Sequence, residues 1–151
     1  MLPEQAMDIQ ATMSWAGDVA KMISRLVLNK AAYKETYSVC TSEHHTWGEI
    51  AEMYKRVGIL KYCTTDTETF LNIISPGNFH VRQQLIYDRY FDRIMDNSKI
   101  LNIAGMKQSE LMPLEKGLAM EFSAFTKNTV WGPCESYDRM DEYLENSGIK
   151  I

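Results

Sequence analysis

Two adjacent histidines lie beside acidic residues in the stretch "SEHHTWGEI", residues 42–50. Imidazole nitrogens and carboxylates are the groups that bind zinc or exchange protons in catalysis. A site here would join His44 or His45 to a neighbouring carboxylate. The candidate carboxylates are Glu43 and Glu49. Adjacent side chains on an extended segment point to opposite sides, which separates the two histidines, and the His-Glu-x-x-His zinc pattern is absent. We therefore expect a loop ahead of a helix and no metal site.

Arginines alternate with aromatic residues in a second stretch, "RQQLIYDRYFDR", residues 82–93. A guanidinium can make a bidentate contact with a phosphate, and an aromatic ring can stack on a base. The stretch could therefore hold a phosphorylated ligand that carries a ring. The alternative is a solvated surface loop, in which the arginines form ion pairs with Asp88 and Asp92.

Helices dominate the elements that must position these residues. Thr46-x-x-Glu49 is a capping box, and it predicts that a helix starts there. We expect Gly58 to end that helix in the left-handed conformation, and Asp96 and Gly105 to bound a later one. Apolar spacing and capping residues together predict helices over residues 17–30, 46–58, 65–74, 97–105, 113–125 and 135–146.

The expected strands are few and short. Alternating or β-branched residues predict them over residues 8–14, 35–41 and 59–63. The pattern indicates an α+β fold that is mostly helical, with a small sheet of short strands. It contains too few strands for a dinucleotide-binding sheet.

The composition narrows the class of protein. The chain has 151 residues, 45% of them hydrophobic, which suits one domain, or one domain with a tail. Its net charge is −4 and it has no basic block, so we expect no nucleic-acid partner. The three cysteines are far apart, which is not typical of a disulfide framework. No apolar run approaches the roughly 20 residues of a membrane span, and no signal peptide is expected, so we predict a cytoplasmic protein.

Five short motifs occur in an order that resembles the C-terminal half of the extended short-chain dehydrogenase/reductase family, the NAD-dependent sugar epimerases and dehydratases. They include "GDVAKMI", "HTWGEIAEMYKRVGI" and "MDNSKILNIAGMK". The resemblance covers roughly residues 10–126. The motifs lie at residues 17–23, 34–39, 45–59, 95–107 and 113–122.

The resemblance implies a division of labour between two halves of an enzyme. In this family an N-terminal Rossmann half holds NAD and the catalytic Tyr-x-x-x-Lys, and the C-terminal half closes over a nucleotide sugar. This chain contains neither the Gly-rich fingerprint nor a tyrosine with a lysine four residues later. We therefore assign no catalytic, cofactor-binding or metal-binding residue here, and we expect NAD only with the missing half. Whether the chain is itself an enzyme stays open.

The resemblance also implies a binding role for Arg89 and Tyr90, because relatives supply nucleotide contacts from this region. We predict a substrate-binding domain over residues 1–126 and a helical tail over residues 127–151. The expected partners are a nucleotide sugar and either a Rossmann-domain chain or a second copy of this one. The alternative is a helical protein-interaction module without enzymatic function.

Overall fold

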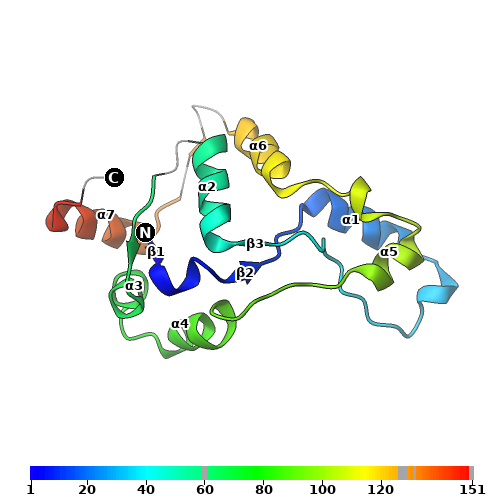
Figure 1. The fold of residues 1–151 in the computed structure, drawn as a ribbon, viewed down its shortest axis with the longest axis horizontal. Helices are drawn as coiled ribbons and strands as arrows, with labels where there is room; N and C mark the ends of the chain where they lie inside the picture. The colour runs from blue at the N-terminus through cyan, green and yellow to red at the C-terminus, as the bar shows by residue number, and fades with distance from the viewer. Residues whose placement is uncertain (59–60, 126–128, 131, 150–151) are drawn as a thin grey trace.

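Helices form most of the molecule, and pairs of very short strands join them (Figure 1). The computed structural model describes residues 1–58, 61–125, 129–130 and 132–149. The predicted α+β, mostly helical fold is confirmed. The helices are α1 (Ala16–Leu26), α2 (Trp47–Val57), α3 (Thr67–Ile74), α4 (Phe79–Gln84), α5 (Ser98–Ala104), α6 (Leu114–Ala124) and α7 (Glu135–Ser147). The strands are β1 (Leu2–Pro3), β2 (Gln10–Ala11), β3 (His45–Thr46) and β4 (Thr64–Thr65).

The strands join segments that are distant in sequence. β1 pairs in parallel with β4, with Leu2 opposite Thr64, so the start of the chain lies beside the segment that leads into α3. β2 pairs antiparallel with β3, with Gln10 opposite Thr46, so it lies beside the start of α2. The N-terminal residues therefore contact the approach to both helices.

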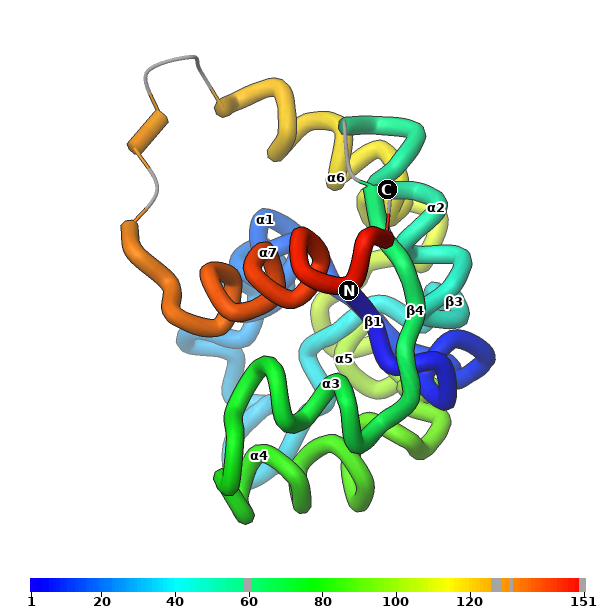
Figure 2. Tube along the Cα trace, turned by 90° about the vertical axis from the view of Figure 1, so that its left-hand side faces the viewer, coloured from blue at the N-terminus to red at the C-terminus, as the bar shows by residue number. Residues whose placement is uncertain are grey.

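The helices pack in pairs along the molecule. α3, α4 and α7 lie at one end and α1 and α5 at the other, with β2, β3 and α2 between them (Figure 1). α2 packs against α6, α1 against α5, and α3 against α7. Viewed from the side, α7 and β1 lie close to α3 (Figure 2).

Two apolar clusters hold the α1–α5 and α2–α6 pairs together. Met22 of α1 and Ile100 of α5 are almost wholly buried, at 0% and 1% exposure, in the cluster between those helices. Ala11, Ile50 and Leu114 form the second cluster, which joins β2, α2 and α6. Buried apolar surface is the main favourable term in folding, so these clusters fix the frame on which the loops lie.

The helices are short. The longest, α7, has 13 residues, and α3 has only 8. Isolated helices of such length are marginal in water, so tertiary packing and end caps must stabilise them. Over the described ranges, no helix has the length and apolar character that a membrane crossing requires.

The predicted start of α2 is confirmed, but its end differs from the prediction. Thr46 Oγ1 accepts from the Glu49 amide over 3.1 Å, and the Glu49 carboxylate accepts from the Thr46 amide over 2.9 Å. Gly58 follows the helix with an extended backbone, at φ −136°, and not in the left-handed region. A Cβ at this position would lie 2.7 Å from the Phe122 ring, so close packing is what the glycine allows.

α1 ends at Leu26, four residues before its predicted end, because Val27 is extended and Leu28 has a positive φ. The ends of α3 and α5 lie close to their predicted positions. Asp96 accepts from the Ser98 amide at the start of α5, and Gly105 ends that helix in the left-handed conformation, at φ 61°. Asp66 caps α3 through the Thr69 amide. Pro113 immediately precedes α6 instead of lying within its first turn.

The strand over residues 35–41 was wrongly predicted, because that segment forms no strand. Side chains take its backbone groups: Lys99 donates to the Thr36 carbonyl and Asn97 to the Cys40 carbonyl. The amide of Thr41 donates to Ser14 Oγ. These backbone groups therefore pair with side chains and not with a neighbouring strand.

Of the two other predicted strands, one is shorter than expected and the described part of the other forms no strand. Residues 8–14 contribute only the two-residue strand β2. Residues 59–60 of the strand predicted over 59–63 lie outside the described part, residues 61–63 form no strand, and β4 follows them directly. The predicted boundary between residues 126 and 127 also lies outside the described residues.

Gly105→Ala tests the left-handed end of α5. The substitution should lower the free energy of unfolding by about 1–2 kcal/mol, because a Cβ is strained at positive φ. Urea unfolding measures the change. Gly132→Ala is the control, since the space around Gly132 is open and its φ is not in the left-handed region. Equal stabilities for the two variants would contradict the assigned conformation.

Candidate functional site

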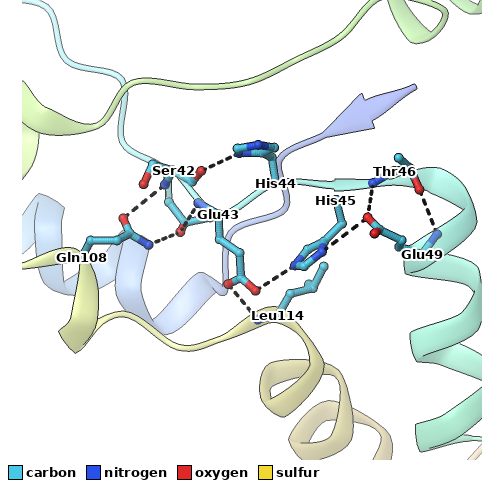
Figure 3. A network of polar contacts seen from close by, with 9 residues as sticks. Ser42, Glu43, His44, His45, Thr46, Glu49, Gln108 and Leu114 are labelled. Carbon is cyan, nitrogen blue, oxygen red and sulfur yellow. Dashed lines mark hydrogen bonds and ion pairs between the residues drawn. The ribbon is translucent and has the colours of Figure 1, made fainter. Parts of the chain in front are cut away.

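His45 lies between two carboxylates at the start of α2 (Figure 3). Its Nε2 is 2.9 Å from Glu43 Oε1, and its Nδ1 is 3.7 Å from Glu49 Oε2. Glu49 is already engaged by the capping box. Nε2 is therefore hydrogen-bonded, while Nδ1 faces a carboxylate beyond hydrogen-bond distance.

Glu43 connects this histidine to α6. Its second carboxylate oxygen accepts from the Leu114 amide over 3.0 Å, at the first residue of that helix (Figure 3). A carboxylate is stabilised there by the unpaired amides and by the positive end of the helix dipole. The Glu43–His45 pair therefore fixes the loop before α2 against the start of α6.

His44 is separated from His45, as the extended backbone predicts (Figure 3). Its Nδ1 is bonded to the Ser42 carbonyl at 3.0 Å. Within the part of the chain that the structure describes, no group of three or more His, Cys, Asp or Glu side chains is placed to hold a metal ion.

A buried amide network lies behind these histidines. Asn97, which is 4% exposed, donates to the Cys40 carbonyl over 3.1 Å and to Gln108 Oε1 over 2.6 Å. Gln108 in turn donates to the hydroxyl of Thr41 and accepts from the Ser42 amide. Both amide side chains therefore bond to residues 40–42, and this network holds the loop before α2 in place.

A broad groove of about 660 Å³ opens beside His45, and several of its polar groups already have protein partners. The Tyr62 hydroxyl donates to Glu52 Oε1 over 2.8 Å, which raises the pKa of Tyr62. A tyrosine that acts as a general base needs the opposite shift. Arg56, also in the groove wall, is bonded to Glu115 at 2.7 Å. These groups make a poor acid–base site.

A smaller and mostly apolar slot of about 190 Å³ lies where β1, α2, α3 and the turn after α4 meet. Two aromatic residues, Trp47 and Phe70, contribute to its wall, and Arg89 is its one charged residue. The lining residues are Leu2, Pro3, Ala6, Met7, Trp47, Phe70, Leu85 and Arg89.

Arg89 ends a π-helical turn, Leu85–Arg89, that continues α4. Such turns are rare and often occur at functional sites. Its Nε is 3.4 Å from Asp88 Oδ2, and both side chains are partly exposed, at 40% and 48%. An exposed ion pair of this kind contributes little stability, so the guanidinium can exchange its partner for a phosphate at small cost.

Tyr90 lies next to the slot and is not one of its lining residues. Its hydroxyl is 2.5 Å from Thr67 Oγ1 in α3, and Thr67 Oγ1 also contacts Gln5. The structure thus places Arg89 among the residues that line the slot. The bond between Tyr90 and Thr67 joins the end of the π-helical turn to α3. The aromatic wall comes from Trp47 and Phe70 instead.

Sequence reasoning missed most of the slot. Trp47 could be placed only as a residue flanking a helix, and residues 2–7 carry no motif at all. Phe70 is one of several apolar residues in the α3 pattern. The parallel pairing of β1 with β4 brings these segments together, and no local signal in two-residue strands predicts that pairing.

Comparison with known proteins adds no relative: no family model matches this chain, and neither does a curated protein or a solved structure. A functional proposal therefore depends on the geometry of the slot and on the resemblance carried by the five motifs.

Glu43→Ala tests the structural role of the histidine cluster. It removes the acceptor of the Leu114 amide and the partner of His45 Nε2, so it should lower the free energy of unfolding by about 1–3 kcal/mol. His44→Ala is the control, because His44 contacts only the nearby Ser42 carbonyl. Urea unfolding of both variants measures the difference, and a Glu43→Ala protein as stable as the control would contradict this role.

Proposed function

We propose that this chain is the substrate-binding portion of an NAD-dependent nucleotide-sugar epimerase/dehydratase-like protein and is not catalytic alone. The observation that carries the proposal is the apolar slot with Arg89 among its lining residues and with the exposed Arg89–Asp88 ion pair beside it. Aromatic and aliphatic side chains suit a nucleobase, and a guanidinium suits the phosphates attached to it. The five family-like motifs favour the same ligand class.

The volume of the slot fits one part of such a ligand. A dry cavity of about 150 Å³ accepts a benzene-sized ring, so about 190 Å³ suits a single planar base. The sugar would then lie outside the slot, and the diphosphate would lie beside Arg89. A C-terminal half that closes over a nucleotide sugar needs this arrangement, with the reacting sugar directed towards another chain.

The chemistry would come from a Rossmann-domain partner that carries NAD. The raised pKa of Tyr62 and the lack of a Tyr-x-x-x-Lys sequence support a catalytic base outside this chain. Exposed apolar side chains at the end of α1 offer a surface for a partner, with Val27 63% and Leu28 85% exposed. We place such a complex in the cytoplasm.

A second candidate is a helical interaction module that binds no small ligand. The same exposed residues favour it, together with Phe79, Tyr87 and Phe91 around α4, which are 63%, 71% and 59% exposed. Apolar side chains exposed to this extent are typical of surfaces that bind proteins.

Calorimetry with UDP-glucose, GDP-mannose and dTDP-glucose separates the two candidates. We expect micromolar binding of at least one of them, weakened about tenfold or more by Arg89→Ala, because a charge-assisted hydrogen bond to phosphate is lost. Arg82→Ala is the control, since Arg82 is paired with Glu68 at 2.6 Å and lies outside the slot. Raised salt should weaken binding to the wild type more than to Arg89→Ala.

Two outcomes would contradict the proposal. No detectable binding of any of the three nucleotide sugars would favour the interaction module. Binding of NAD, or turnover of a nucleotide sugar, by this chain alone would overturn the claim that catalysis lies elsewhere.

A further inference from the structure

The tail helix α7 reaches the end of α3 through one arginine. Arg139 donates from Nε to the Ile73 carbonyl and from Nη2 to the Ile74 carbonyl, each over 2.7 Å. These are the last two residues of α3, whose final carbonyls have no partner within the helix. A cation at this end also complements the helix dipole. α7 and α3 lie at the same end of the molecule (Figure 1), and Figure 2 shows α7 above α3.

Those carbonyls are the main partners of the guanidinium. The other contact of Arg139 is an ion pair with Glu135 at 3.5 Å, and the Glu135 side chain is 93% exposed. Such a pair contributes little. The geometry of Arg139, with two short bonds to consecutive carbonyls, is therefore directed at α3.

α3 in turn carries part of the slot. Phe70 lines it, and Thr67 is bonded to the Tyr90 hydroxyl beside the turn that bears Arg89. α3 has only 8 residues, so its two end caps decide how much of it stays helical. Asp66 caps the start through the Thr69 amide, and Arg139 caps the end.

The last turn of α3 and the slot wall are the same piece of backbone. In an α-helix the amide of residue 74 bonds to the carbonyl of residue 70, so fraying at Ile74 removes one of the two backbone bonds of Phe70 and leaves its amide bonded to the Asp66 carbonyl. A loose Phe70 would widen the slot. Loss of the Arg139 cap would therefore affect Phe70, which would contact the ligand, although α7 itself does not line the slot.

We propose that Arg139 is a positioning residue for the slot, by which the docked tail helix keeps Phe70 and the Thr67–Tyr90 contact in their binding geometry. The inference rests on the proposed function for its ligand, because it assigns the slot as the binding site. It gives the segment outside the family resemblance a role: the slot is formed while α7 is docked and loosened when α7 is released.

The test combines hydrogen exchange with nucleotide binding in three variants. Arg139→Ala should speed exchange of the amides over residues 70–75 while the amides of α1 and α5 stay protected. It should also weaken binding of the same UDP-, GDP- or dTDP-sugar by about fivefold or more. Arg139→Lys should recover part of both effects, since an ammonium can still donate to one carbonyl. Glu135→Ala should leave both unchanged.

Protection of the α7 amides by the bound ligand is a second measurement. A residue that only stabilises the fold would not change it. If docking of α7 strengthens binding of the nucleotide sugar by some factor, then the bound nucleotide sugar must favour docking of α7 by that same factor. Saturating nucleotide sugar should therefore slow exchange of the α7 amides in the wild type. Arg139→Ala should abolish that protection. Unchanged binding by Arg139→Ala, or no ligand protection of α7, would overturn the inference.

Failure of the proposed function would be visible separately. If the wild type binds none of the three nucleotide sugars, the proposed function is wrong. Hydrogen exchange then tests by itself whether Arg139 positions the slot. Faster exchange over residues 70–75 and 85–90 in Arg139→Ala supports positioning of the slot by α7. Exchange that rises evenly along the chain, or not at all, overturns it.

Discussion

The pairing of backbone groups outside the helices is the constraint on which the rest of this structure depends. Strands supply very little of it, because each described strand has only two residues. A backbone group left unpaired away from water costs free energy comparable to a lost hydrogen bond, so side chains must act instead. Asn97 and Gln108 bond the segment around Thr41, and Glu43 bonds the start of α6. These contacts fix the loop that leads into α2.

The same constraint engages polar residues that look catalytic. His45, Glu43 and Glu49 are all occupied in holding β3 against α2 and α6. The slot is different, because its wall is apolar and the ion pair of Arg89 is exposed and easily exchanged. A ligand would displace few protein contacts in the slot and many beside His45. This difference in existing contacts, and not the volume, favours the slot over the groove as the ligand site.

Local signals in the sequence predict most of the helices, but not α4 or the end of α1 at Leu26, and they predict the site only in part. Capping residues are short-range, so Thr46, Asp66 and Gly105 bound their helices as expected. The strand predicted over residues 35–41 failed because its alternation does not reveal whether a neighbouring strand exists. Arg89 could be singled out by its type and place. Its companions in the slot could not, since they meet only through the pairing of β1 with β4.

The central claim is that the slot binds the base of a nucleotide sugar. NMR titration of the ¹⁵N-labelled chain with each nucleotide sugar tests it most directly, because chemical shifts report where a ligand sits. The account predicts that the largest shifts occur at the Trp47 indole and at the amides of Phe70 and Leu85, around the slot. Shifts concentrated around Arg56 and Tyr62 in the groove, or no shifts at all, would contradict it.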